Sequence, residues 1–478
     1  MHKAQHIHLI GICGTAMASL AGLLQLRGHR ITGSDMAAYP PMSDQLHALG
    51  IPVAEPYLEA NLQPAPDLVI VGNAISRGNV ELEYVLDQRI PFRSLAAIIH
   101  EEFLAGRESL LVAGTHGKTT TASMLAWIYE VASRNDAALT PSFLIGGVVE
   151  NFGTSFLLRE TQPFIIEGDE YDTAFFDKGP KFMHYFPDAA ILTHVEFDHA
   201  DIYRDLDAVK TAFKRLVNLV PRRGRVIAYD ASASVTECVA KAFCTVERYG
   251  FAEGSYWRMT NLNQRGTATT WTLLRDGEHF ADLKLGMPGE HNALNATAAA
   301  ALAAGQGIPA AAIAEALATF RSVKRRLEVC AEVDGITVID DFAHHPTAIR
   351  ETLRALRARY AGQRLWAVLE PRSNTLRRNV FEQELVESLL LADEVVLASV
   401  FKSESIPMAE RLAPERVIDG LRAHGHSAVL LADADAIVAY LAPRLRKGDV
   451  VAILSNGGFG GIYTKLPAAI QAREVVRA

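Results

Sequence analysis

Cysteine is scarce in this sequence, and its spacing excludes two common uses of the residue. The 478 residues contain four cysteines, and none belongs to a Cys-x-x-Cys pair. The spacing therefore matches no metal-binding pattern, and the density is too low for a disulfide framework. We accordingly expect a protein of a reducing compartment, the cytoplasm, with free thiols at Cys13, Cys238, Cys244 and Cys330.

An excess of positive charge is also lacking. The 47 Lys and Arg residues are outnumbered by 55 Asp and Glu residues, which gives a net charge of -8. A nucleic-acid-binding protein neutralises phosphates with clustered basic side chains, so the composition predicts no nucleic-acid partner. It leaves room for a small anionic ligand, because one basic pocket can lie on an acidic protein.

Long apolar runs are rare, and the one at residues 9–26 is uncharged and long enough to cross a membrane. The run contains three glycines and two hydroxyl side chains, and its first part has the pattern of a strand. We interpret it as a buried strand, a glycine turn and a helix rather than a membrane span. We therefore expect no integral membrane segment, and no sequence pattern indicates an obligate protein partner.

Strand-like and helix-like patterns alternate along the chain, which is typical of parallel α/β domains. The first part has predicted strands at 6–10, 30–34, 67–71 and 91–94. The middle part has predicted strands at 109–113, 163–166 and 189–193 and predicted helices at 119–131, 209–220 and 293–304. The last part has predicted strands at 337–339, 365–369, 394–397 and 450–454.

A glycine-rich loop lies between the predicted strand 109–113 and the predicted helix 119–131. Successive N–H groups of such a loop, at a helix N-terminus, form a cradle for phosphate. Lys118 can then reach the β- and γ-phosphates, and Thr119 can offer its hydroxyl to Mg²⁺. The loop is shorter than the strict pattern, which has glycine where Val112 stands, and an ordinary glycine turn is the alternative. We predict that ATP phosphates are bound by Gly114, Thr115, His116, Gly117, Lys118, Thr119 and Thr120.

These patterns predict an α/β protein of three consecutive α/β domains, because 478 residues are too many for one hydrophobic core. A Rossmann-like N-terminal domain would span residues 1–107. A P-loop ATP-binding domain would follow at 108–322, and a Rossmann-like C-terminal domain at 323–478.

Two clusters of metal-binding side chains follow predicted strands of the middle domain. Residues 167–172 contain four carboxylates, and residues 194–201 combine histidine with acidic side chains. Ligands collect at the carboxyl edge of such sheets, and Mg²⁺ on ATP needs oxygen ligands. A solvated acidic turn is the alternative for either cluster alone, but both clusters behind a phosphate-binding loop favour a metal site.

The N-terminal turn at residues 11–17 is a second candidate for anion binding. It fails the dinucleotide fingerprint, because Cys13 and Ala16 occupy two glycine positions. A nicotinamide-dependent oxidoreductase is therefore the weaker enzyme class, although Asp35 lies at the acidic position after the second strand. The turn still suits a diphosphate at a helix N-terminus. A non-enzymatic nucleotide switch is a further alternative, but it would not need so much chain outside the phosphate-binding unit.

Several longer motifs resemble those of the Mur ligase family, whose members join amino acids or peptides to UDP-N-acetylmuramate in peptidoglycan metabolism. The similarity runs nearly from end to end of the chain. It is carried by the loop 114–121, Glu167, His199 in Asp198-His199-Ala200-Asp201, the pair Asn292 and Asn295 after His291, Arg326 in Lys324-Arg325-Arg326-Leu327-Glu328, and Asp340-Asp341-Phe342-Ala343-His344-His345-Pro346.

The resemblance implies an ATP-dependent, amide-forming ligase that uses ATP and Mg²⁺. It implies metal ligation by Thr119, Glu167 and His199, and nucleotide contacts from Asn292, Asn295, Arg326 and Asp341. It assigns catalytic roles to Lys118, Arg326 and His344. It implies contacts to UDP-N-acetylmuramate from Gly11, Cys13, Gly14, Thr15, Asp35 and Ser76. For Ser76 an ordinary turn residue is the alternative.

Departures from the alanine-adding branch of the family indicate the peptide substrate. Residues 171–185, 194–201, 370–375 and 455–461 are similar to the branch that attaches the recycled murein tripeptide L-alanyl-γ-D-glutamyl-meso-diaminopimelate. The alternative is a biosynthetic UDP-N-acetylmuramate–L-alanine ligase. Guanidinium binds carboxylate with two hydrogen bonds, so we expect contacts to the peptide carboxylates from Arg372 and Arg377. We expect further contacts to this polar peptide from His345, Ser373 and Asn374. Solvated arginines, and a histidine pair bonded to backbone at a helix start, are the alternatives.

The implied reaction has two steps. The lactyl carboxylate of UDP-N-acetylmuramate attacks the γ-phosphorus of ATP, and the peptide amine then attacks the resulting acyl phosphate. Such an attack gathers negative charge, so cations must dominate the site. His344 or His345 could orient substrate or accept an amine proton. Some family members carbamylate a lysine in the region of Lys210 and Lys214, and we treat both as solvated.

Overall fold

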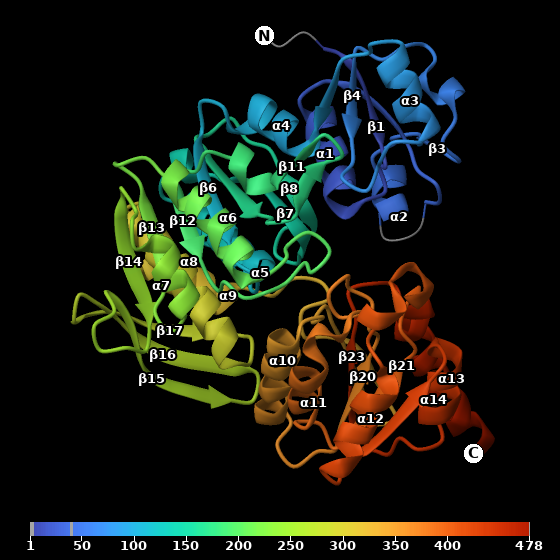
Figure 1. Cartoon of the computed structure of the whole chain (residues 1–478). Helices are drawn as coiled ribbons and strands as arrows, with labels where there is room; N and C mark the ends of the chain where they lie inside the picture. The colour runs from blue at the N-terminus through green and yellow to red at the C-terminus, as the bar shows by residue number, and fades with distance from the viewer. Residues whose placement is uncertain (1–3, 39–41, 478) are drawn as a thin grey trace.

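The computed structural model describes residues 4–38 and 42–477. Its described strands form successive large sheets along the chain, each covered by helices, and the predicted three-domain α/β fold is confirmed (Figure 1). The central domain, green to yellow, lies beside the blue N-terminal domain and the orange-to-red C-terminal domain. Within the described ranges, no helix combines the length and the apolar character that a membrane crossing requires.

The N-terminal domain is built on a parallel sheet with the strand order β3-β2-β1-β4-β5. The uncharged run 9–26 becomes the end of strand β1, a glycine turn and helix α1, as predicted. Gly11 makes the turn with φ +81°. The elements are β1 (His6–Ile10), α1 (Thr15–Leu26), β2 (Arg30–Ser34), α2 (Met42–Ala48), β3 (Val53–Ala54), β4 (Leu68–Val71), α3 (Val80–Asp87), β5 (Phe92–Ser94) and α4 (Leu95–Ile99).

The central domain has the strand order β17-β16-β15-β14-β13-β12-β6-β9-β7-β8. β6 (Glu108–Ala113) pairs in parallel with β9 (Pro163–Gly168) and β12 (Ala189–Leu192), so the segments after all three strands meet at one carboxyl edge. Alanine-rich α8 is buried along nearly its whole length and packs against α5, because small side chains allow close approach. The main helices are α5 (Lys118–Ala132), α6 (Leu206–Leu219), α7 (Ala233–Val239), α8 (Glu290–Gly305) and α9 (Ala310–Thr319).

One edge of this sheet continues into an antiparallel meander that the sequence patterns did not reveal. In β15 the buried positions are only Trp257 and Met259, which alternate with half-buried residues, and the second half of the strand has no buried position. The remaining strands are β7 (Ser142–Val149), β8 (Thr154–Leu157), β10 (Asp172–Ala174), β11 (Asp177–Pro180), β13 (Arg225–Tyr229), β14 (Thr245–Gly250), β15 (Trp257–Arg265), β16 (Ala268–Arg275) and β17 (Glu278–Leu285).

The C-terminal domain has the strand order β18-β19-β23-β20-β21-β22, parallel except for the edge strand β18. Helix α10 begins at His345, whose ring accepts a hydrogen bond from Thr347 N, and Pro346 occupies its first turn. The elements are β18 (Glu328–Val333), β19 (Ile336–Asp341), α10 (Pro346–Arg359), β20 (Leu365–Leu369), α11 (Glu382–Leu389), β21 (Glu394–Ala398), α12 (Pro414–Ala423), β22 (Ser427–Leu431), α13 (Ala434–Leu441), β23 (Val450–Leu454) and α14 (Ile462–Arg477).

Candidate active site

The phosphate-binding loop is held by its neighbours at the carboxyl edge of the central sheet. Gly114 and Gly117 have φ values of +131° and +79°, which favour glycine. A Cβ on Gly114 would lie 2.2 Å from Thr193 Oγ1, and one on Gly117 would lie 2.5 Å from Asn295 Oδ1. Gly117 is the N-cap of α5 and provides no side-chain cap. The first N–H groups of α5 therefore stay available for an anion.

Lys118 lies in this loop with its ammonium group against the buried carboxylate of Glu170. Lys118 Nζ is 2.8 Å from Glu170 Oε2 and 2.8 Å from Gly114 O. Burial lowers the pKa of Lys118, but the carboxylates of Glu170, Asp169 and Glu167 together outweigh burial and the pKa is raised. Glu170 also bonds His199 Nε2 at 3.0 Å. One carboxylate therefore holds the loop lysine and a predicted metal ligand together.

Thr119 and Glu167, two further predicted metal ligands, are in direct contact. Thr119 Oγ1 donates to Glu167 Oε2 at 3.1 Å, and Gly146 N donates to Glu167 Oε1 at 2.6 Å. Burial raises the pKa of Glu167 in spite of the nearby positive charges, so a bound cation would be favourable there. Hydroxyl and carboxylate oxygens are the donors that Mg²⁺ prefers. The donor set fits Mg²⁺, and His199 borders the same cavity.

The His199–Glu170 pair makes the stability of the protein depend on pH. Burial lowers the pKa of His199, but the hydrogen bond and charge of Glu170 raise it, from 6.5 to about 9. Because the folded pKa exceeds the unfolded one, the stabilisation is complete below pH 6.5 and is lost as the pH rises through about 9. We expect the Tm of the wild type, in buffer with EDTA, to fall over this range about 2–4 °C more than that of His199→Gln. Equal falls in scanning calorimetry would contradict the pairing.

A cavity of about 560 Å³ adjoins the loop on the side of α8. This volume suits a small-molecule ligand. Asn295 borders the cavity with its side chain close to Gly117, whereas the Asn292 amide donates to Pro288 O at 2.7 Å. Burial lowers the pKa of His291, which also borders the cavity, to about 4. A neutral imidazole and the Asn295 carboxamide are therefore available for a nucleobase, and a contact from Asn292 stays a prediction.

Arg326 and Asp341 bring the C-terminal domain to the loop. Arg326 Nη2 lies 3.4 Å from Thr119 Oγ1, and Arg326 borders both the 560 Å³ cavity and the cavity that holds Lys118. The Asp341 carboxylate accepts hydrogen bonds from Leu327 N, Ala343 N and Thr352 Oγ1 at 2.8, 2.9 and 3.1 Å. Asp341 thus anchors the chain beside Arg326, and its direct contact with nucleotide stays a prediction.

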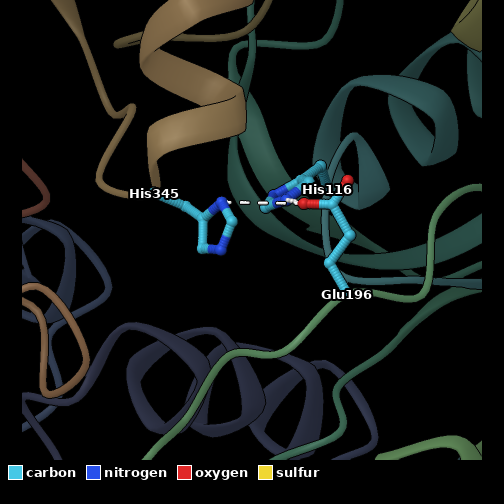
Figure 2. A group of neighbouring side chains, drawn as sticks. All are labelled: His116, Glu196 and His345. Atoms are coloured by element: carbon cyan, nitrogen blue, oxygen red, sulfur yellow. Dashed lines mark hydrogen bonds and ion pairs between the residues drawn. The ribbon is translucent and has the colours of Figure 1, made fainter. Parts of the chain in front are cut away.

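His116, Glu196 and His345 form a contact between the central and C-terminal domains (Figure 2). His116 Nε2 lies 3.1 Å from Glu196 Oε2, and Thr347 Oγ1 donates to the same oxygen at 2.7 Å. Three of their ligand atoms lie within 4.8 Å of one another. Both ring nitrogens of His345, however, have backbone partners, Thr347 N and Phe197 O, each at 3.2 Å. We therefore interpret the cluster as a hydrogen-bonded domain contact, and His345 as a helix cap rather than a peptide ligand.

Replacing Glu196 with alanine removes two hydrogen bonds of this contact. The substitution is expected to raise the KM for ATP roughly fivefold, because the loop residue His116 is no longer tied to α10. Initial rates at varied ATP concentration measure the effect. Glu253→Ala, at a side chain that is 91% exposed, is the matched control and should leave the KM unchanged. An unchanged KM in Glu196→Ala would show that the contact does not support the loop.

A third cavity, of about 370 Å³, lies against the C-terminal domain and is bordered by the predicted peptide contacts Arg372, Ser373, Asn374 and Arg377. Arg377 Nη2 donates to Asn374 Oδ1 at 2.6 Å, whereas Arg377 Nε is buried with no hydrogen-bond partner among the described residues. The Arg372 guanidinium lies 3.9 Å from the centre of the Phe401 ring. A buried, unpartnered guanidinium N–H in a cavity indicates a missing acceptor such as a carboxylate.

Tyr171 connects this cavity to the predicted metal site. Its hydroxyl donates to Asp201 and accepts a hydrogen bond from Asn374 Nδ2 at 2.7 Å. Asn374 Nδ2 also lies 2.8 Å from Asp201 Oδ2, and the Tyr171 ring centre is 4.9 Å from that of His199. The sequence identified 171–185 only by its similarity to the branch that attaches the tripeptide. The structure shows that its first residue holds the two domains together.

His344 borders both the Lys118 cavity and the 370 Å³ cavity. Its Nδ1 lies 2.8 Å from Phe342 O, so Nδ1 carries a proton and Nε2 keeps its lone pair. Burial lowers the pKa of His344. The ring can therefore accept a proton at Nε2 at neutral pH.

The predicted diphosphate turn of the N-terminal domain is preorganised, and among its described residues only Ala16 borders one of these three cavities. The Asp35 carboxylate accepts a hydrogen bond from Cys13 N at 2.9 Å, and α1 begins at Gly14 with no side-chain cap. Ser76 is exposed on a separate loop. Ala16, in the first turn of α1, borders the Lys118 cavity. The turn residues that stay together are Gly11, Cys13, Gly14, Thr15 and Asp35.

Lys210 and Lys214 both bond the exposed carboxylate of Glu237, at 2.8 and 2.5 Å. Both lie on α6. The Lys214 side chain is 42% exposed, in accord with a solvated lysine, whereas the Lys210 side chain is only 15% exposed.

Three models of protein families match successive segments of this chain. Residues 6–105 match the Mur ligase family, catalytic domain. Residues 112–303 match the Mur ligase middle domain, and residues 325–457 match the Mur ligase, glutamate ligase domain. Each match lies within one of the predicted domains.

Full-length relatives share this arrangement. The chain is 43% identical over 461 residues to the UDP-N-acetylmuramate--L-alanyl-gamma-D-glutamyl-meso-2,6-diaminoheptandioate ligase of Escherichia coli K12, covering 96% of this chain and 97% of that protein. A murein peptide ligase from Psychrobacter arcticus 273-4 is 38% identical, with a TM-score of 0.75 and coverage of 98% and 99%. A UDP-N-acetylmuramate-alanine ligase from Thermotoga maritima has a TM-score of 0.81 and coverage of 98% and 100%, but is 23% identical, so it shows the shared fold alone.

Proposed function

This chain belongs to the Mur ligase family, and on that premise we propose that it joins L-alanyl-γ-D-glutamyl-meso-diaminopimelate to UDP-N-acetylmuramate in peptidoglycan recycling. It is an ATP-dependent ligase that forms an amide bond. We place the reaction in the cytoplasm, where ATP is available, and the free thiols Cys13, Cys238, Cys244 and Cys330 support a reducing compartment.

The observation that carries the proposal is that three cavities meet in a row across the domain boundary. The 560 Å³ cavity and the Lys118 cavity share His116, Gly117 and Arg326. The Lys118 cavity and the 370 Å³ cavity share Asp198, His199, His344 and Asn456. A nucleotide in the first cavity and a peptide in the third would therefore both reach the middle one. This is the geometry that coupled phosphoryl and acyl transfer requires.

In the first step the lactyl carboxylate of UDP-N-acetylmuramate attacks the γ-phosphorus, giving an acyl phosphate and ADP. Lys118 and Arg326 supply positive charge where the phosphoryl group is transferred. Thr119, Glu167 and His199 would hold Mg²⁺, which when bound shields the phosphate charge from the incoming carboxylate. To release Lys118 for phosphate, the nucleotide must compete with the Glu170 carboxylate.

In the second step the peptide amine attacks the acyl carbon and phosphate leaves. His344 borders the two cavities between which the amine must lie, and its Nε2 is free to take a proton. The tripeptide carries three carboxylates beyond its amine. Arg372 and Arg377 offer guanidinium groups to them in the 370 Å³ cavity.

Ligation of L-alanine is the alternative. A free alanine has one carboxylate and a small side chain, so it would leave much of a 370 Å³ cavity with two arginines unfilled. Mass spectrometry of the products tests the proposal. Incubation with ATP, Mg²⁺, UDP-N-acetylmuramate and the tripeptide should give the condensed UDP-N-acetylmuramoyl tripeptide with equimolar ADP and phosphate. Its absence, with the alanine adduct formed instead, would overturn the peptide assignment.

A further inference from the structure

Asn456 carries a polar atom that the fold itself does not explain. The residue follows β23, and its Oδ1 is buried with no hydrogen-bond partner among the described residues. Buried polar atoms of folded proteins nearly always have partners, so an exception calls for a ligand or another specific cause. Nothing in the proposed reaction as described so far uses this residue.

The loop around Asn456 is firmly held, so the unpartnered oxygen does not result from a loose segment. Arg325 Nη2 donates to Ser455 O at 2.8 Å and to Gly457 O at 2.9 Å. Ser455 Oγ donates to Glu370 Oε2 at 2.5 Å. A Cβ on Gly457 would lie 2.1 Å from Arg372 Nε, so the loop also packs tightly against the peptide cavity. The backbone on both sides of Asn456 is therefore preorganised.

Asn456 lies where the Lys118 cavity meets the peptide cavity. Three other residues border both cavities. Asp198 already accepts hydrogen bonds from Thr375 Oγ1 at 2.6 Å and from His199 N at 2.7 Å. His199 Nε2 is bonded to Glu170. Among the described residues at this junction, Asn456 is thus the one whose side chain has a buried oxygen without a hydrogen-bond partner, and His344 Nε2 keeps its lone pair.

We propose that Asn456 is a catalytic residue that orients the attacking amine of the peptide, a role that rests on the proposed ligase function. An amine that attacks through its lone pair has two N–H bonds, and each of them needs a hydrogen-bond acceptor. Two acceptors at the junction, Asn456 Oδ1 and His344 Nε2, can accept one hydrogen bond each. When the N–C bond and both N–H bonds are held in place, the direction of the lone pair is fixed as well, and it then points to the acyl carbon.

The step balances with these two residues. The peptide amine attacks in its neutral form, and its lone pair forms the bond to the acyl carbon. The bond between that carbon and the phosphate oxygen breaks, and its electron pair leaves with phosphate. His344 Nε2 takes the proton of the N–H group bonded to it and passes that proton to the departing phosphate, while the N–H group bonded to Asn456 remains on the amide. Asn456 exchanges no proton and acts only as a hydrogen-bond acceptor.

The experiment separates the two half-reactions. Hydroxylamine is small enough to attack the acyl phosphate without guidance, so hydroxamate formed from ATP and UDP-N-acetylmuramate reports the first step. In Asn456→Ala we expect kcat with the tripeptide to fall about a hundredfold, with hydroxamate formation within twofold of the wild type. Asn456→Asp keeps an acceptor oxygen and should be at least about tenfold faster than the alanine variant. Asn379→Ala, at an exposed residue of the same domain, is the matched control.

Two outcomes would overturn the role of Asn456. Wild-type tripeptide ligation by Asn456→Ala would show that the oxygen does not contact the amine. An equal loss of hydroxamate and tripeptide product would show that the residue serves the first step or the fold. Failure of the underlying ligase proposal looks different, because the wild-type protein itself would then form no tripeptide product.

Discussion

Replacing Lys118 with methionine is expected to lower kcat by about a thousandfold. Lys118 is the ammonium group of the phosphate-binding loop, and its Nζ lies between Gly114 O and the Glu170 carboxylate. Methionine keeps the aliphatic part of the side chain but removes the charge that meets the γ-phosphate. In a buried site no solvent ion replaces that charge, so the transition state loses more stabilisation than the bound substrates do.

Steady-state phosphate release and the Kd of a fluorescent ATP analogue measure this effect. The analogue should also bind more weakly, because the same charge contacts ground-state phosphates. Lys284→Met, at an exposed lysine in β17, is the control and should retain wild-type activity. A kcat within tenfold of wild type in Lys118→Met would contradict the assignment of the loop.

Replacing Arg377 with alanine is expected to lower kcat/KM for the tripeptide by about a hundredfold to a thousandfold. Arg377 Nε is buried without a protein partner, while Nη2 is held by Asn374. Removing the guanidinium leaves a peptide carboxylate without its partner in the 370 Å³ cavity. Hydroxamate formation without peptide should stay at the wild-type rate, because the first step does not involve this cavity.

Arg377→Lys should recover little of the loss, since an ammonium group cannot reproduce the planar pair of hydrogen bonds. Arg204→Ala, at a side chain that is 87% exposed, is the matched control. Equal loss of the hydroxamate and peptide reactions would show that Arg377 supports the fold rather than the peptide.

The sequence predicted the elements whose signals are local. The strand, glycine loop and helix around residues 114–121 lie where expected, because glycine spacing and apolar periodicity are both readable over short windows. The clusters at 167–172 and 194–201 come together with the loop because β6, β9 and β12 are adjacent parallel strands. Thr119 and Glu167 therefore meet although they are far apart in the chain.

Side-chain contacts between distant parts of the chain, both within and between domains, could not be predicted in this way. Tyr171 and Asn374 are 203 positions apart, and no periodicity links them. Glu170 and Glu196 belong to clusters that the sequence singled out, but their roles depend on partners, Lys118 and His116, which only the fold identifies. For His345 the role expected from the sequence differs from the contacts in the structure. It was expected at the peptide, whereas its Nδ1 caps the start of α10 and its Nε2 is bonded to Phe197 O of the central domain.

The central claim is that the tripeptide is the substrate that receives the acyl group, and a comparison of the tripeptide with L-alanine tests it most directly. Tripeptide and L-alanine would be compared under the same conditions with ATP, Mg²⁺ and UDP-N-acetylmuramate, and kcat/KM determined for each from phosphate release. The 370 Å³ cavity with its two arginines predicts a value for the tripeptide at least about a hundredfold higher. A value for L-alanine that equals or exceeds that of the tripeptide would contradict the account.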